Sequence, residues 1–201
     1  MKKTAFCLDF DGTLTKQEVL PLLSKEVGIY EEMQALTNAT INGFLEFGSS
    51  FKLRVRLLRS IPIHDVQKII RKVEIHKKLL SFLHSISGSA FIITGNLDVW
   101  LQAVMQDLNL RFFCSEAEVV NGELVGIKKI INKGSVINEL KETFDRIVVV
   151  GEGMNDSSMF SQADIKIAFG AVHQPVQTII ENSDYVVYEE ESLCRLLKML
   201  L

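Results

Sequence analysis

Residues 4–15, with the sequence TAFCLDFDGTLT, decide the fold of this chain. The apolar run ends at Asp9, which is followed by a second carboxylate at Asp11 and then by Gly12. A short uninterrupted apolar run of this kind is typical of a strand buried on both faces, as in a parallel sheet covered by helices. Gly12 allows the chain to turn sharply directly after the strand, so that the two carboxylates can converge.

The rest of the chain continues this pattern of buried strands and amphipathic helices. Further apolar runs, rich in β-branched residues, lie at 91–93, 147–150, 165–169 and 185–187. Apolar residues recur at helical spacing over residues 99–108, 135–144, 176–182 and 193–201. The Asn-Gly pair inside residues 119–125 predicts a hairpin with a type I′ turn. This alternation predicts an α/β fold, with a Rossmann-like parallel sheet that has helices on both faces.

Residues 16–78 differ from the rest because they contain almost no strand-like run. Helical patterns occupy residues 18–27, 31–39, 42–58 and 65–73 instead. We therefore predict a small helical cap domain at 16–78, inserted after the first strand. The core domain then consists of residues 1–15 and 79–201.

Composition narrows the class of protein. A net charge of −3 without a long basic tract argues against nucleic acid or an anionic membrane as the partner. The three cysteines and four histidines show neither paired nor metal-ligand spacing, which predicts reduced, mostly buried thiols. The first apolar run stops at Asp9, too soon for a signal peptide, and no window reaches the roughly 18 apolar residues of a membrane helix. These features predict a cytoplasmic location; we separately expect a monomer or homodimer.

Polar clusters follow the predicted strands. The carboxylates of Asp9 and Asp11 suit a hard cation. One of the two carboxylates could also attack phosphorus while the other transfers protons. Thr94 and Gly95 follow the second strand, where a hydroxyl and backbone N–H groups can bind an anion at a helix N-terminus. Lys133 precedes a helix and can neutralise charge on a phosphoryl group.

The last cluster is the glycine-flanked turn after residues 147–150. Here Glu152, Asn155 and Asp156 can bring three oxygen-bearing side chains to one cation. The carboxyl ends of parallel strands meet at one edge of a sheet, so we expect all the clusters to meet there. Together they supply what phosphoryl transfer requires.

In order and content, these clusters resemble the haloacid dehalogenase (HAD) superfamily, and within it the phosphoserine phosphatase-like branch, from Asp9 to about Leu201. The resemblance implies that Asp9 is the nucleophile and Asp11 the general acid and base. It implies that Thr94, next to Gly95, and Lys133 bind the phosphate.

The resemblance also implies a cofactor, Mg²⁺. Its ligands would be Asp9, the backbone carbonyl of Asp11, and Glu152, while Asn155 and Asp156 would support both metal and phosphate. The implied reaction is hydrolysis of a small phosphorylated metabolite through an aspartyl phosphate.

Two cap residues match positions that bind substrate in phosphoserine phosphatases. Glu18 would hold an ammonium group, and the forked guanidinium of Arg54 would hold a carboxylate. Phosphoserine, or a similar small carboxylate-bearing phosphomonoester, is therefore the substrate implied. The alternatives are hydrolysis or phosphotransfer on another metabolite such as a sugar phosphate, and a catalytically silent binding module.

Three positions depart from the family pattern. Glu152 stands where aspartate is usual, and Asn96 follows Gly95 where a second glycine is usual. The predicted cap exit at 73–76 lacks the usual proline and glycine, although we still expect hinges near 15–16 and 74–75.

Overall fold

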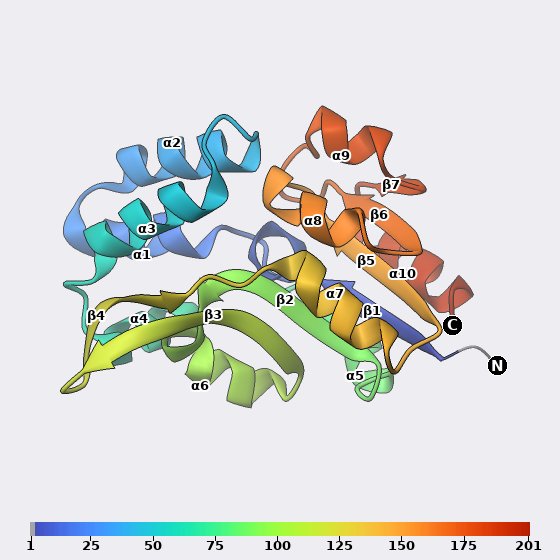
Figure 1. The fold of residues 1–201 in the computed structure, drawn as a ribbon, viewed down its shortest axis with the longest axis horizontal. Helices are drawn as coiled ribbons and strands as arrows, with labels where there is room; N and C mark the ends of the chain where they lie inside the picture. The colour runs from blue at the N-terminus through green and yellow to red at the C-terminus, as the bar shows by residue number, and fades with distance from the viewer. Residues whose placement is uncertain (1–2) are drawn as a thin grey trace.

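The computed structural model describes residues 3–201; Met1 and Lys2, which the sequence assigns to the core, lie outside the described residues. Within residues 3–201 a seven-stranded sheet has the order β4-β3-β2-β1-β5-β6-β7 (Figure 1). The strands are β1 (Thr4–Leu8), β2 (Ala90–Leu97), β3 (Arg111–Val120), β4 (Glu123–Lys129), β5 (Arg146–Gly151), β6 (Ile165–Phe169) and β7 (Tyr185–Val187). Neighbouring strands pair in parallel, apart from the antiparallel pair β3–β4.

Helices cover both faces of this sheet, as predicted. Alternate residues of β1 point to opposite faces, because successive side chains of a strand alternate. Phe6 and Leu8 join one apolar cluster, while Ala5 and Cys7 join the other. The first cluster includes residues of α5 (Lys77–Ser85), α6 (Asp98–Leu108) and α10 (Glu190–Met199), and the second includes residues of α7 (Lys133–Lys141), α8 (Ser157–Phe160) and α9 (Gln177–Glu181). The central strand β1 is buried along its whole length.

The segment between β1 and β2 is helical. It begins with the turn η1 (Phe10–Leu14) and continues through α1 (Val19–Ser24), η2 (Lys25–Val27), α2 (Tyr30–Ile41), α3 (Phe47–Leu58) and α4 (Ile63–Ile70). Helices α1 to α3 lie together on one side of the molecule, whereas α4 packs against α6 (Figure 1). The division into core and cap at residues 16 and 78 remains a prediction.

One predicted helix in this segment is too long. The sequence pattern indicates a helix over 42–58, but α3 begins at Phe47. Gly43 has a φ of +78°, which breaks the helix, and the Glu46 carboxylate accepts hydrogen bonds from the N–H groups of Gly48 and Ser49. The resulting loop carries α3 over the end of the sheet.

The two chain segments that lead into and out of the helices lie side by side. Thr15 and Ile75 form an isolated antiparallel bridge, and the N–H of Lys16 donates to the carbonyl of Glu74 at 2.8 Å. This contact places the two predicted hinges next to each other. Nothing in residues 3–201 forms a helix of the length and apolarity that a membrane crossing requires.

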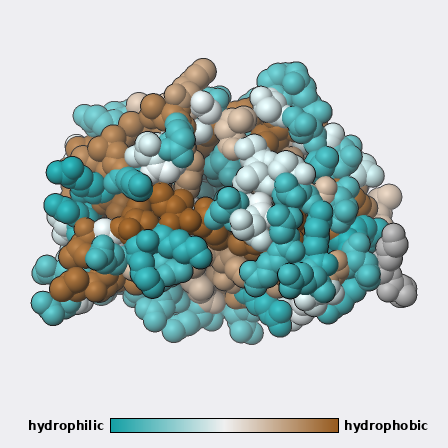
Figure 2. Space-filling model, in the orientation of Figure 1, coloured by the Kyte–Doolittle hydropathy of each residue, from teal (hydrophilic) through white to brown (hydrophobic). Residues whose placement is uncertain are grey.

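Apolar side chains also gather on the surface between α3 and the β3–β4 hairpin (Figure 2). Leu53 and Leu57 of α3 are exposed there, as are Val119, Val120 and Val125 of the hairpin. Helix α3 contacts β4, so the helical segment meets the sheet at this hairpin as well as at the carboxyl ends of the strands.

Candidate active site

The predicted polar clusters meet at the carboxyl ends of β1, β2 and β5. A pocket there is lined by residues from the strand ends and from the helical segment: Asp9, Asp11, Glu18, Leu20, Thr37, Thr40, Ile41, Phe47, Phe51, Arg54, Gly95, Asn96, Glu152 and Asn155. Thr94, Lys133 and Asp156 are buried directly behind this lining and contact it. The structure thus places all ten predicted site residues at one edge of the sheet.

The turn η1 aims both aspartates at the pocket. Asp11 has extended backbone angles and Gly12 a φ of +70°, so the chain reverses directly after β1. A side chain at residue 12 would also collide with the Glu152 carboxylate, since an ideal Cβ would stand 3.2 Å from Glu152 Cδ and closer to Oε1. Both the turn and the close approach of Glu152 therefore require glycine at this position.

Lys133 links two buried carboxylates. Its Nζ lies 2.7 Å from Asp9 Oδ1 and 2.7 Å from Asp156 Oδ1. Burial alone would lower the pKa of Lys133, but Asp156 and Asp9 raise it above its usual value, so the side chain stays an ammonium. Burial and then repulsion from Asp156 raise the pKa of Asp9 well above its usual value, and Lys133 opposes that shift.

Asp11 occupies a separate hydrogen-bonded position. Its Oδ1 accepts from the N–H of Val19 at 3.0 Å, and its Oδ2 accepts from Asn96 Nδ2 at 2.6 Å and Thr94 Oγ1 at 3.4 Å. Burial, followed by repulsion from Glu18, raises the pKa of Asp11 to about 7. A carboxyl group with this pKa can both donate and accept a proton near neutral pH.

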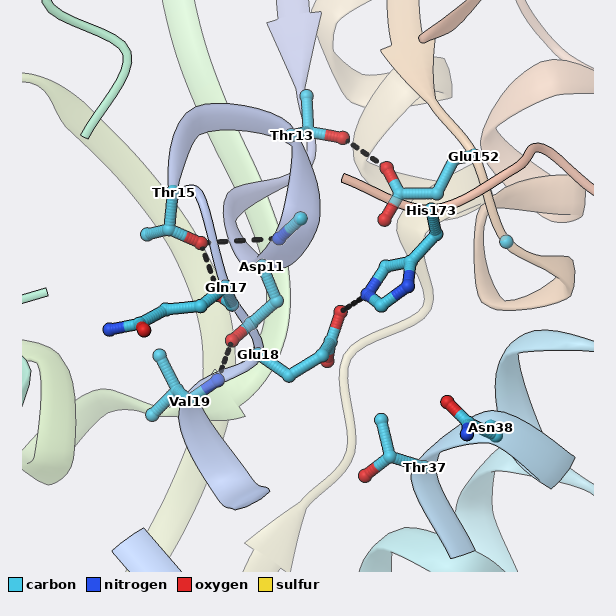
Figure 3. A network of polar contacts seen from close by, with 12 residues as sticks. Asp11, Thr13, Thr15, Gln17, Glu18, Val19, Thr37, Asn38, Glu152 and His173 are labelled. Atoms are coloured by element: carbon cyan, nitrogen blue, oxygen red, sulfur yellow. Dashed lines mark hydrogen bonds and ion pairs between the residues drawn. The ribbon is translucent and has the colours of Figure 1, made fainter. Parts of the chain in front are cut away.

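The turn after β5 positions Glu152. Asp156 Oδ2 accepts from the backbone N–H groups of Glu152 at 3.0 Å and Gly153 at 3.2 Å, which fixes the turn. Thr13 Oγ1 donates to Glu152 Oε2 at 2.6 Å and holds the carboxylate at the pocket (Figure 3). Burial, then Asp156 and Asp9, raises the pKa of Glu152 well above its usual value.

The helical segment contributes the two predicted substrate-binding residues to the pocket lining. Arg54 on α3 is 5% exposed, and its Nη1 donates to Thr37 Oγ1 at 3.2 Å. Its Nε has no hydrogen-bond partner among residues 3–201. Burial lowers the pKa of Arg54, while Glu18 and Asp11 act in the opposite direction. A buried guanidinium with a free donor is a ready site for a carboxylate.

Three residues take part that the sequence did not identify as site residues. Thr13 positions Glu152, Asn96 holds Asp11, and His173 Nε2 lies 3.1 Å from Glu18 Oε1. Asn96 stood out only as a departure from the family pattern. Thr13 lies within the same turn as the two aspartates, which was an available signal. His173 is 155 residues away from Glu18, so no local spacing could have indicated it.

A largely parallel sheet with two carboxylates directly after its central strand and a helical insertion above them defines a class of hydrolase. Residues 6–161 match the haloacid dehalogenase-like hydrolase family, and the chain belongs to that family.

Individual relatives narrow the resemblance to one branch. The phosphoserine phosphatase of Methanocaldococcus jannaschii is 29% identical, over 98% of this chain and 97% of the relative. That of Lactococcus lactis is 28% identical, over 84% of each chain. A solved substrate-bound phosphoserine phosphatase has a TM-score of 0.82 at 27% identity, covering 99% of this chain and 98% of its own. A phospho-aspartyl intermediate analogue of phosphoserine phosphatase has a TM-score of 0.81 at 28% identity, covering 98% of both chains. The resemblance to the phosphoserine phosphatase-like branch is thereby confirmed.

Proposed function

We propose that this chain is a phosphomonoesterase that acts through an aspartyl phosphate on Asp9, with phosphoserine as the best-fitting substrate. One observation carries the proposal. A single pocket is lined by Asp9 and Asp11, which follow β1, and by Glu18 and Arg54 from the helical segment. The first pair suits phosphoryl transfer, and the second pair suits an ammonium and a carboxylate on the same small molecule.

In the proposed reaction a carboxylate oxygen of Asp9 attacks phosphorus, and the bond between phosphorus and the ester oxygen breaks. The Asp11 carboxyl group gives its proton to the departing alkoxide. Asp11 then takes a proton from a water molecule, whose oxygen attacks phosphorus and frees the Asp9 carboxylate. Lys133 and Thr94 lie beside the two aspartates; the lysine balances the charge of the phosphoryl oxygens, and the threonine hydroxyl donates a hydrogen bond to them.

The donor set fits the magnesium ion that the family implies. In the part of the chain that the structure describes, the buried carboxylates Asp9, Glu152 and Asp156 face one buried lysine, which leaves negative charge uncompensated. Asp9, Glu152 and the carbonyl of Asp11 offer the oxygen ligands that Mg²⁺ prefers. When bound, the ion would offset the charge of the phosphate group.

We propose that the helical segment moves when substrate enters. The pocket is small, with a volume of about 40 Å³, and it is lined from both the strand ends and the helical segment, so that movement of the helices would widen it. The paired segments at Thr15 and Ile75 are the proposed hinge, because they are the places where the helices join the sheet. Closure after binding would exclude water from the site.

The proposed substrate is tested by phosphate release from a panel of phosphomonoesters with Mg²⁺. We expect phosphoserine to be preferred and Arg54→Ala to raise its KM by at least about tenfold, because a charge-assisted hydrogen bond contributes roughly 1.5–3 kcal/mol. Arg56→Ala is the matched control, since Arg56 is exposed on the same helix. Equal rates with sugar phosphates would refute phosphoserine as the substrate. No phosphate release from any compound would favour a catalytically silent binding module.

A further inference from the structure

Three potential metal ligands meet at one side of the pocket. One ligand atom from each of Glu18, Glu152 and His173 lies within 4.8 Å of the other two. The His173 imidazole points at the Glu18 carboxylate, with the Glu152 carboxylate beside it (Figure 3). The three residues come from separate segments: the residue before α1, the residue after β5 and the loop after β6. The fold, and not local sequence, brings them together.

The backbone of Gly12 forms a cradle for this group. An ideal Cβ at residue 12 would stand 3.2 Å from Glu18 Oε1 and closer still to Glu152 Oε1. The two carboxylates therefore converge on one point, which a side chain at residue 12 would fill. This convergence is independent of the contact between His173 and Glu18.

The charges of the group are poorly compensated. Among residues 3–201, neither Glu18 nor Glu152 has a lysine or arginine nitrogen within 4.0 Å, and the ion-pair partner of Glu18 is His173. Glu152 is 3% exposed, and repulsion from Glu18 is one of the causes that raise its pKa. Two partly buried carboxylates this close together favour a cation between them.

We propose that Glu18, Glu152 and His173 bind a divalent transition-metal ion such as Zn²⁺ or Mn²⁺. Mg²⁺ selects oxygen ligands, whereas an imidazole nitrogen with two carboxylates suits the softer Zn²⁺; Mn²⁺ favours the two carboxylates and serves as the paramagnetic probe of the imidazole. Bonds of about 2.0–2.2 Å place the donors around one ion roughly 3–4 Å apart, so small side-chain rotations complete the site. The site is separate from the predicted magnesium site, although the two share Glu152.

Occupation of this site would have a consequence for substrate binding. The ion would engage Glu18, the residue proposed to receive the substrate ammonium, and would therefore compete with substrate. This consequence rests on the proposed function, whereas metal binding itself does not.

The test is pulsed electron paramagnetic resonance of Mn²⁺ added alone to the full chain. In the wild type we expect coupling between the manganese electron spin and an imidazole nitrogen, because His173 is a ligand. We expect this coupling to persist in Asp9→Asn, although the proposed function predicts that this variant is inactive. Failure of the metal-site proposal can therefore be told apart from failure of the proposed function. The coupling is lost in His173→Gln and retained in His64→Gln, whose histidine is 67% exposed on α4.

Zn²⁺ affinity provides the second measurement. His173→Gln and Glu18→Gln should each weaken Zn²⁺ binding by at least about tenfold, since even outer-shell changes cost 10–100-fold. Manganese bound solely by oxygen ligands in the wild type, after enough Mn²⁺ has been added to fill the predicted magnesium site as well, would overturn the proposal without any variant. Nitrogen coupling and Zn²⁺ affinity that survive His173→Gln would overturn it equally.

Discussion

At the scale of single residues, Gly95 determines how closely the helical segment approaches the sheet. Gly95 lies in β2 at the pocket, under the ring of Phe47 from α3. An ideal Cβ at residue 95 would stand 3.0 Å from Phe47 Cε2 and closer to Cζ. Phe47 in turn stacks on Phe51 with ring centroids 5.4 Å apart. The aromatic wall of the pocket therefore depends on the missing side chain.

Gly95→Ala should consequently destabilise the protein by about 1–3 kcal/mol through overpacking. The cost should shrink by about 1 kcal/mol in a Phe47→Ala background, because the two sites are in contact. Urea unfolding of the four proteins in this cycle measures the coupling. Gly88→Ala is the control, since an added Cβ there meets nothing within 4 Å among the described residues. Equal costs of Gly95→Ala in both backgrounds would contradict the account.

The residues of the site were predictable where they follow a strand directly. Asp9, Thr94 and Glu152 each sit at or just past a buried apolar run, so the parallel topology alone brings them together. His173 and Thr13 act through partners 155 and 139 residues away, and that proximity exists only in the fold. The part of His173 could not be predicted from spacing, and the only signal for Thr13 was its position in the same turn as the two aspartates.

At the scale of elements, helix α5 takes its N-terminal cap from another helix. Glu190 Oε1, at the start of α10, accepts from the N–H groups of Lys78 at 2.6 Å and Leu79 at 3.0 Å. Burial alone would raise the pKa of Glu190, but these donors, together with His76, hold it below its usual value. The carboxylate form of Glu190 thus stabilises the contact between α5 and α10.

Glu190→Ala should cost about 1 kcal/mol of unfolding free energy at neutral pH, as loss of a cap does. The pKa of Glu190 is lower in the folded state than in the unfolded state. The stability that its carboxylate contributes is therefore fully present above the unfolded-state pKa of about 4.3, and it is lost as the pH falls through the folded-state pKa. The difference between wild type and variant should therefore shrink below about pH 4. Urea unfolding across pH measures it, with Glu189→Ala, an exposed neighbour without a capping bond, as control. A difference that stays constant with pH would contradict the capping role.

Two elements, α5 and the start of β3, could not be predicted from the sequence, and each has its own reason. Helix α5 has no side-chain cap from its own N-cap residue, His76, and its capping residue lies 111 or more residues away. The start of β3 at Arg111 was also unpredicted, because its side chains are mostly half-buried and give no clear alternation. The hairpin turn was predictable, since Asn121 and Gly122 both adopt the positive φ angles that this dipeptide favours.

At the scale of the whole molecule, the helical segment packs against the sheet around the site. The small pocket, the bridge between Thr15 and Ile75 and the contact of Phe47 with Gly95 all belong to this packing. A ligand that mimics the phosphoryl group on Asp9 should favour the folded state, because it binds that state alone.

Beryllofluoride with Mg²⁺ should therefore raise the melting temperature of the wild type. At about 100 times Kd the gain is roughly 2.7 kcal/mol, or about 5–10 °C for a chain of this length. Asp9→Asn should show no such gain, because it lacks the carboxylate that beryllofluoride modifies. Differential scanning calorimetry measures both. A similar gain in the two proteins, or none in the wild type, would contradict the assignment of Asp9.

In the proposed reaction, Asp9 carries the phosphoryl group during turnover. The most direct measurement is an acid quench of the wild type during turnover of phosphoserine labelled on phosphorus, followed by mapping of the label to a peptide. The account predicts label on the peptide that contains Asp9, none in Asp9→Asn, and loss of phosphate release in that variant. Label on another residue, or undiminished phosphate release by Asp9→Asn, would contradict it.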